Sequence, residues 1–146
     1  MSQNTVKIFT DGACKGNPGL GGWGVLIIEG GKEKGIYGGS FNTTNNKMEL
    51  TATIEALKFF KSPQIIELYT DSKYVKDGIT EWIINWKKNG WKNASKKPVK
   101  NSELWIELDH MTQHHDVSWF WVKGHSNHRE NDIADALANK GIDELK

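Results

Sequence analysis

The sequence predicts an α/β fold in which a mixed five-stranded sheet carries helices on its faces. Three strand-like segments come first, before any helix-like segment. After them, helical and strand-like patterns alternate along the rest of the chain. Consecutive strands joined by short turns pair antiparallel, whereas strands separated by helices pair in parallel, so both kinds of pairing are expected in one sheet.

The expected strands are short runs rich in β-branched and aromatic residues, bounded by glycine, proline and asparagine. A turn-rich connection is expected from Gly12 to Gly22, around Asn17-Pro18-Gly19, and a hairpin turn over residues 29–32. The strands are expected at residues 7–10, 23–29, 35–41, 65–70 and 117–122.

The expected helices are segments in which apolar residues recur at helical spacing. In the first, Met48, Ala52 and Leu57 recur in this way, and Ser62-Pro63 ends the helix. In the last, Gly141 is expected to stop the helix. The helices are expected at residues 44–61, 72–77, around 82–86, 102–113 and 129–140.

Length and composition predict one domain over residues 1–146. A hydrophobic content of 37% with 7 Trp can supply a core for a chain of this size. Apolar runs are too short to span a membrane, and the N-terminal residues lack the pattern of a signal peptide. The single cysteine, Cys14, suits a reducing compartment, so a cytoplasmic protein is expected. No segment obviously makes an oligomer, so a monomer is expected.

The near-neutral net charge of +1 conceals an uneven distribution. No acidic residue lies between Glu81 and Glu103, yet six lysines do. The other residues then carry 13 basic against 18 acidic side chains, a balance of −5. Uncompensated lysines that repel one another suit a polyanion, so a basic lobe on an acidic body is expected.

Two expected strands end alike, in Phe9-Thr10-Asp11 and Tyr69-Thr70-Asp71. If these strands are parallel neighbours, the two carboxylates face each other at the sheet edge where α/β proteins usually place their chemistry. Glu49 and Asp135 lie on helices beside apolar stripes. Converging carboxylates would need cations, and oxygen ligands select Mg²⁺ or Mn²⁺. The spacing equally allows four ordinary solvated acids.

Several motifs give the chain a specific resemblance over nearly its whole length. Their order and spacing resemble a bacterial type 1 ribonuclease H, which implies a ribonuclease H-like fold. A basic protrusion typical of bacterial members is also present, as WIINWKKNGW (82–91). The matching segments are FTDGACKGNPG (9–19), TTNNKMEL (43–50), YTDSKYV (69–75) and WVKGHSNHRENDIAD (121–135).

The resemblance implies that Asp11, Glu49, Asp71 and Asp135 are catalytic carboxylates that hold Mg²⁺, or Mn²⁺ as a substitute. Two ions are expected with substrate bound, because paired ions balance four negative charges and suit in-line phosphoryl displacement. Asp132 lies close to Asp135 in sequence, but the family's spacing to the Gly-His element favours Asp135.

His125 lies in a turn-rich loop before the last expected helix. A histidine in a loop is usually a plain surface residue, yet near a phosphoryl-transfer site it can move protons. The resemblance implies such a catalytic role, in leaving-group protonation or product release. Similar proteins often have glycine where this chain has Asn127, and His128 opens the helix and is less suited to catalysis.

The resemblance also implies a surface that reads the shape of an RNA–DNA hybrid. In the minor groove the expected contacts are Cys14, Asn17, Asn45, Asn46 and Lys73, the last in place of a common glutamine. Turn and helix-cap roles explain the asparagines equally well. On the DNA strand the expected contacts are Thr44, Asn101, Trp82, Trp86, Lys87, Lys88, Lys96 and Lys97. Asn42 replaces an arginine of the family near the phosphate contact.

The expected activity is endonucleolytic hydrolysis of the RNA strand of a hybrid, leaving 5′-phosphate and 3′-hydroxyl ends. Removal of RNA primers and R-loops is implied by the resemblance. Two other classes remain open. A hybrid-binding module without chemistry would lack at least one core carboxylate, and none is missing. A transposase or integrase domain can share the fold but usually carries three acidic residues and lacks the protrusion.

Overall fold

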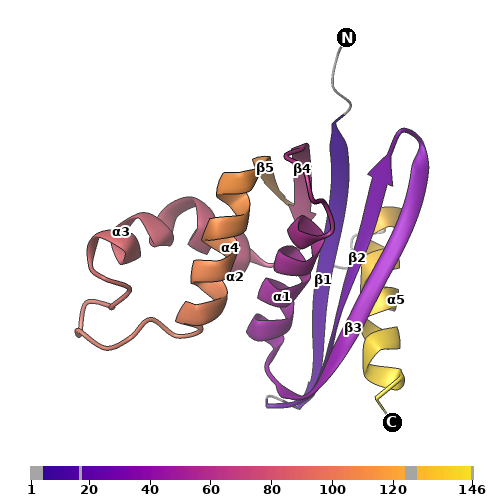
Figure 1. The fold of residues 1–146 in the computed structure, drawn as a ribbon. Coiled ribbons are helices and arrows are strands. Elements are labelled where there is room, and N and C mark those ends of the chain that lie inside the picture. Colours follow the sequence, from indigo (N-terminus) through magenta and orange to yellow (C-terminus); the bar gives the residue numbers. More distant parts are fainter. Residues whose placement is uncertain (1–4, 17, 124–127, 146) are drawn as a thin grey trace.

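The computed structural model describes residues 5–16, 18–123 and 128–145. Its centre is one five-stranded sheet with the strand order β3-β2-β1-β4-β5 (Figure 1). The strands are β1 (Val6–Gly16), β2 (Gly19–Glu29), β3 (Lys32–Thr43), β4 (Ile65–Thr70) and β5 (Asp116–Trp121). The helices are α1 (Asn45–Lys58), α2 (Lys73–Asp77), the π-helical turn η1 (Gly78–Trp82), α3 (Ile83–Lys88), α4 (Ser102–His114) and α5 (Arg129–Asp143).

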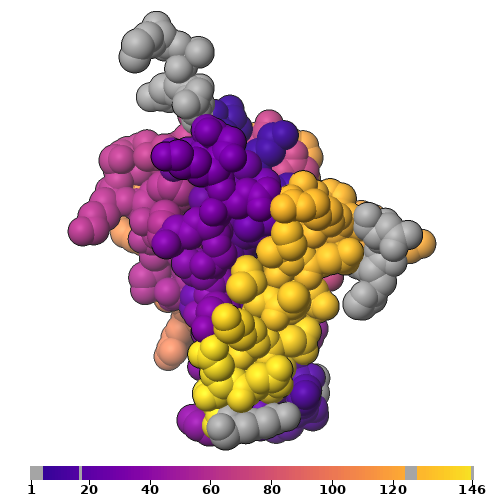
Figure 2. All heavy atoms as spheres, turned by 90° about the vertical axis from the view of Figure 1, so that its right-hand side faces the viewer, coloured from indigo at the N-terminus to yellow at the C-terminus, as the bar shows by residue number. Residues whose placement is uncertain are grey.

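The pairing confirms the predicted mixed sheet. β1, β2 and β3 pair antiparallel, and β4 pairs in parallel with both β1 and β5. Helices α1 and α4 lie side by side on one face, and α5 packs against β1, β2 and β3 on the other. Figure 2 shows the surface of α5 (yellow) beside the hairpin strands. No helix within the described residues has the length and apolar character needed to span a bilayer.

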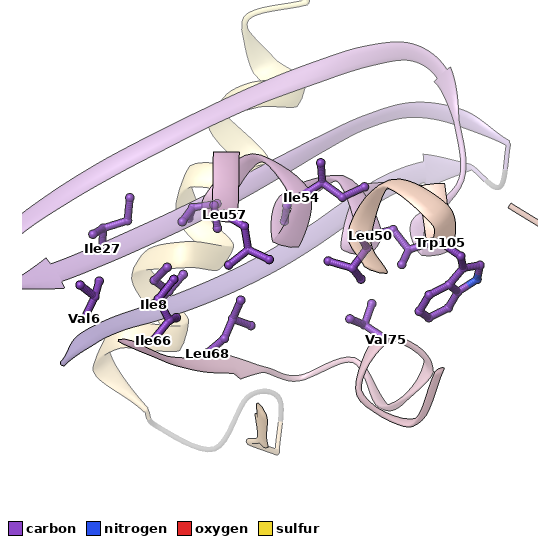
Figure 3. Close-up of a cluster of buried hydrophobic side chains, with 14 of the residues drawn as sticks. Val6, Ile8, Ile27, Leu50, Ile54, Leu57, Ile66, Leu68, Val75 and Trp105 are labelled. Carbon is purple, nitrogen blue, oxygen red and sulfur yellow. The ribbon is translucent and has the colours of Figure 1, made fainter. Parts of the chain in front are cut away.

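The main core fills the space between the sheet and α1 with α4 (Figure 3). Ile8 and Leu68 from adjacent strands, Leu50 and Leu57 from α1, and Trp105 from α4 are fully buried in it. A smaller cluster of Phe9, Leu26 and Ala134 fills the α5 face. Buried aliphatic surface of this kind supplies most of the folding free energy, so the sheet is a rigid platform for residues at its edges.

The predicted turn from Gly12 to Gly22 was wrong in extent. Most of this segment is strand, because β1 and β2 stay paired as far as Gly16 and Gly19. The glycines serve close packing: a Cβ at Gly22 would lie 2.0 Å from the carbonyl oxygen of Ala138 in α5. The glycine at this position therefore indicates close packing against a helix and not a loop.

Two predicted helix ends also differ from the structure. α1 ends at Lys58 rather than at residue 61. α5 continues through Gly141 to Asp143. Gly141 is buried, and a Cβ there would lie 2.1 Å from the carbonyl oxygen of Gly38. The residue is therefore a contact point between α5 and β3, and the helix has no reason to stop at it.

Residues 78–101 form a projection from the sheet, here called the protrusion, which contains η1, α3 and a loop (Figure 1). The chain changes direction in this loop at residues with positive φ, namely Gly90, Trp91, Lys96 and Asn101. Trp86 packs against the core and contacts Trp105, with ring centroids 5.3 Å apart. This contact anchors the protrusion to α4.

Candidate active site

Asp11 and Asp71 are brought together by the register of two parallel strands. Thr10 of β1 is paired with Thr70 of β4, and each aspartate is the next residue along the chain. The prediction that these strands are neighbours is confirmed. Asp11 still lies within β1, opposite Gly24, and is buried, whereas Asp71 lies just beyond the end of β4.

Glu49 reaches the same point from α1. The helix approaches β1 so closely that a Cβ at Gly12 would lie 2.5 Å from the backbone nitrogen of Glu49. Only glycine allows this approach. The ligand oxygens of Asp11, Glu49 and Asp71 consequently lie within 4.8 Å of one another. Three of the four predicted carboxylates thus form a compact cluster.

The fourth carboxylate, Asp135, enters from α5. It borders the same hollow, of about 210 Å³, as the other three. The Asn139 amide donates to the backbone oxygen of Asp135 at 2.9 Å and approaches its Oδ1 at 3.5 Å. Asp132 also borders the hollow but is exposed, and of these two aspartates it is Asp135 that contributes to the raised pKa of Asp11. This geometry favours Asp135, rather than Asp132, as the fourth carboxylate of the cluster.

The cluster is electrostatically unfavourable when its carboxylates carry their charges alone. Burial, together with the charges of Asp71 and Asp135, raises the pKa of Asp11 to about 9. Burial and the charges of Asp11 and Asp71 raise the pKa of Glu49 as well. Buried like charges are tolerated only with protons or cations between them. The site therefore favours the uptake of positive charge.

Unpartnered oxygens show where that charge would be bound. Glu49 Oε1, Asp71 Oδ1 and Asn131 Oδ1 are buried and have no hydrogen-bond partner among the described residues. Asp11 Oδ1 accepts a bond of 2.9 Å from the backbone N–H of Gly12. Buried polar atoms normally have partners. A set made only of oxygen donors fits hard divalent cations such as Mg²⁺ and does not favour zinc.

Three residues that the sequence analysis did not single out lie beside the carboxylates: Trp121, Asn139 and Asn131. Trp121 donates its indole N–H to the backbone oxygen of Asp71 at 3.1 Å, and Lys73 places its ammonium 4.8 Å from the centroid of the Trp121 ring. Asn139 holds Asp135, and Asn131 faces the hollow. The only sequence signal for Trp121 was its place in the Trp-Val-Lys-Gly-His motif.

The residues expected in the minor groove surround the hollow in part. Asn45 borders it, and Asn46 is exposed at the start of α1. Thr44 caps α1, its hydroxyl accepting from the backbone N–H of Lys47 at 3.2 Å. Cys14 is half-buried, and its thiol donates to the backbone oxygen of Gly16. Asn17 and His125 lie outside the described residues.

Asn101 lies apart from the carboxylates, at the start of α4. It borders a larger hollow, of about 430 Å³, together with Lys47 and Leu104. Its amide donates to the hydroxyl of Tyr74 at 3.1 Å, which also accepts from the indole of Trp105. Asn101 is therefore held in place by the core, and its expected phosphate contact stays a prediction.

The tryptophans of the protrusion differ in their exposure to solvent. Trp82 is 40% exposed, whereas Trp86 is half-buried. The prediction that the lysines here are uncompensated was wrong for Lys87, whose ammonium lies 3.2 Å from a carboxylate oxygen of Asp109 in α4. That partner lies beyond the lysine-rich stretch in sequence. The other lysines expected to bind are exposed, Lys88, Lys96 and Lys97.

The RNase H family profile matches residues 3–143. The chain is 61% identical over 141 residues to the ribonuclease H of Alcanivorax borkumensis, covering 97% of this chain and 93% of that enzyme. It is 56% identical over 140 residues to the ribonuclease H of Cupriavidus necator, covering 96% of this chain and 97% of that enzyme.

Solved structures show the same fold. LC9-RNase H1, described as a type 1 RNase H with the type 2 active-site motif, is similar at a TM-score of 0.89 and 31% identity, over 100% of this chain and 75% of that one. LC11-RNase H1 in complex with an RNA/DNA hybrid is similar at a TM-score of 0.67 and 25% identity, over 96% of this chain and 98% of that one. The profile and the bacterial relatives span nearly the entire chain, and the chain belongs to the ribonuclease H family of endoribonucleases.

Proposed function

We propose that this protein hydrolyses the RNA strand of RNA–DNA hybrids with Mg²⁺, or Mn²⁺ as a substitute, held by Asp11, Glu49, Asp71 and Asp135. The observation that carries the proposal is the buried cluster of mutually repelling carboxylates with unpartnered oxygens. Hydrolysis leaves 5′-phosphate and 3′-hydroxyl ends. The hybrid bound to LC11-RNase H1, a protein of the same fold, supports the substrate class.

The chain's own contribution is to fix ligands from four separate elements. β1, α1, the end of β4 and α5 each bring one carboxylate, so the core sets the geometry before substrate binds. Asp11, Glu49, Asp71 and Asp135 would hold the divalent ions, which when bound would supply Lewis-acid stabilisation of the charge that develops on the phosphate. Trp121 and Asn139 hold the backbone of Asp71 and Asp135 in place. His125 is proposed to move the proton of the departing 3′-oxygen or to aid product release.

The proposed recognition of the hybrid uses two surfaces. Beside the carboxylates, short polar groups face the sugar edges and 2′-hydroxyls of the minor groove. The protrusion, with exposed Trp82 and its lysines, contacts the DNA strand. The proposed contacts are Cys14, Asn17, Asn45, Asn46 and Lys73 in the groove, and Thr44, Trp82, Trp86, Lys87, Lys88, Lys96, Lys97 and Asn101 on the DNA strand.

We also propose that the enzyme acts as a monomer in the cytoplasm, where it removes RNA primers and R-loops. A single cysteine suits a reducing compartment. The bacterial relatives of similar length are ribonucleases H. Sedimentation of the purified protein tests the monomer, and the accumulation of hybrids in cells without it tests the cellular role.

The experiment that tests the activity offers labelled RNA–DNA hybrid, RNA duplex and DNA duplex to the protein. Each substrate is incubated with Mg²⁺, with Mn²⁺ or with a chelator. We expect cleavage of the RNA strand in the hybrid alone, abolished by the chelator. End analysis should find 5′-phosphates. Cleavage of the RNA duplex at an equal rate, or cleavage of hybrid in excess chelator, would overturn the proposal.

A further inference from the structure

Three histidines, His110, His114 and His115, gather at the end of α4. His110 and His114 are four residues apart and exposed, and His115 follows as a buried residue. His110 and His114 border a hollow of about 290 Å³ between the ends of α1 and α4, with Leu57, Lys58, Phe60 and Met111. Residues four apart on a helix lie on one side, with Cβ atoms roughly 5–6 Å apart.

Hydrogen bonding distinguishes the three imidazoles. Both nitrogens of His115 are engaged: Nδ1 accepts from the backbone N–H of Gln64 at 3.0 Å, and Nε2 lies 3.1 Å from the backbone oxygen of Leu57. His114 has Nε2 at 3.3 Å from the backbone oxygen of Lys61. A carbonyl oxygen only accepts, so Nε2 of His114 is the donor in this contact, and the neutral ring can offer Nδ1 to an ion.

This arrangement is the one that metal-ligating histidines usually have. One ring nitrogen donates to a backbone carbonyl, which fixes the tautomer and the ring orientation, and the other nitrogen binds the ion. His110, one turn earlier on the same side, is exposed and can rotate to supply the second nitrogen. The pair therefore offers one oriented donor and one adjustable donor.

The local charges also tolerate a cation. Both histidines lie in the final turns of α4, where the partial negative charge of the helix end favours positive ions. Lys58 borders the hollow, and its ammonium lies 3.6 Å from carboxylate oxygens of both Glu55 and Glu107. Glu107, one turn before His110, adds negative charge to this side of the helix.

We propose that His110 and His114 form a second cation site, specific for divalent ions that prefer imidazole, such as Ni²⁺, Cu²⁺ or Zn²⁺. Two histidines at this spacing on a helix are a known chelating pair. Imidazole suits these ions, whereas carboxylate and water suit Mg²⁺. The two sites therefore differ in chemistry: oxygen donors for hard ions at the sheet edge, and nitrogen donors for softer ions on α4.

Binding at this site stabilises the folded chain. An ion that binds the folded state alone raises the free energy of unfolding in proportion to the logarithm of its concentration over its Kd. The pair is formed by the helical conformation of α4 and is lost when the helix unfolds. The thermal midpoint should therefore rise with Ni²⁺, without any change at the carboxylate cluster.

The test is calorimetric titration of the full-length protein with Ni²⁺ in excess Mg²⁺, which occupies the oxygen ligands. We expect one Ni²⁺ per chain. His110→Ala and His114→Ala should each weaken binding by about tenfold or more, because each leaves one imidazole. Gln113→Ala is the matched control, because it removes an exposed side chain from the same turn and leaves both imidazoles. It should bind Ni²⁺ like the parent protein.

Thermal unfolding gives a second, independent readout. Ni²⁺ should raise the Tm of the parent protein and of Gln113→Ala, and should leave the Tm of either histidine variant nearly unchanged. If His110→Ala binds Ni²⁺ as tightly as the parent, the ion is held elsewhere and the proposal fails. It fails equally if the parent protein binds no Ni²⁺ in excess Mg²⁺.

Discussion

The carboxylate cluster and the protrusion differ in almost every physical property. Asp11 is 5% and Glu49 is 6% exposed, whereas the lysines of the protrusion are exposed. The carboxylates come from four elements that the core holds together, and the protrusion is one continuous segment. One region concentrates repelling charge in a fixed geometry. The other spreads charge over a solvated surface.

In the proposed function, the fold separates the residues for chemistry from those for hybrid binding. Buried like charges cost folding free energy, and such a cost is kept where function needs it. Exposed lysines cost little and attract a polyanion over a distance. Substitutions in the cluster should therefore change catalysis and stability. Substitutions in the protrusion should change affinity and its salt dependence.

The largest effect is expected when a charge is removed from the cluster. Asp11→Asn or Asp71→Asn keeps the size of the side chain but weakens the hold on cations. Cleavage of hybrid should be nearly abolished, measured as single-turnover rate over a range of Mg²⁺ concentrations. Normal turnover by either variant at saturating Mg²⁺ would place the metal site elsewhere.

A smaller loss of activity is expected when His125 is replaced. His125→Ala should slow cleavage by roughly 10²–10⁴-fold, the usual contribution of a proton-transfer group, with metal dependence unchanged. His128→Ala should be mild in rate. Its Nδ1 caps α5 by accepting from the backbone N–H of Asn131 at 3.2 Å, so a loss of about 1 kcal/mol in stability is expected instead. A slower rate for His128→Ala than for His125→Ala would assign the proton-transfer role to His128 instead.

The stability of the fold should change in the opposite direction to the activity when Asp11 is replaced. The pKa of Asp11 is about 9 in the folded chain against an ordinary value of 3.8. Between pH 3.8 and about 9, Asp11 is therefore protonated in the folded state and ionised in the unfolded state. The free energy of unfolding falls as the pH rises through this range. Asn cannot ionise, so metal-free Asp11→Asn should be more stable than the parent by about 1–4 kcal/mol near pH 7.

Urea unfolding in chelator, repeated across this pH range, measures the difference between the two proteins. It should widen as pH rises toward the pKa of Asp11. A variant that is less stable than its parent at every pH would show that the cluster stabilises the fold. The buried charge would then not be a cost of function.

The smallest effect on catalysis is expected from the protrusion. Replacing Lys87, Lys88, Lys96 and Lys97 by Gln should make the slope of log affinity against log salt shallower by about two to four units. Lys87 should contribute least, because Asp109 already pairs with it. The loss should appear in KM, with kcat nearly normal. A double variant of the exposed Lys32 and Lys34, on the β2–β3 hairpin, is the matched control. An unchanged slope in the quadruple variant would remove the protrusion from hybrid binding.

Sequence reasoning predicted what depends on local pattern. The strand endings in Thr-Asp placed Asp11 and Asp71 correctly, because parallel neighbours bring equivalent ends together. The pattern of Met48, Ala52 and Leu57 predicted α1, and with it Glu49 at the same hollow.

Long-range packing could not be predicted in this way. Gly22 and Gly141 resemble turn signals in sequence, but their partners lie more than 100 residues away along the chain. The pairing of Lys87 with Asp109 and the bond from Trp121 to Asp71 likewise need the tertiary structure. These contacts have no local periodicity that would reveal them.

The most direct test of the separation of chemistry from binding is the affinity of Asp71→Asn for RNA–DNA hybrid. It is measured at several salt concentrations in Mg²⁺, beside the parent protein. We predict a Kd within a few-fold of the parent and the same salt slope, because the proposed phosphate contacts of the lysines belong to the protrusion and not to the cluster. A large loss of affinity, or a shallower slope, would mean that the cluster and the protrusion do not act as separate regions.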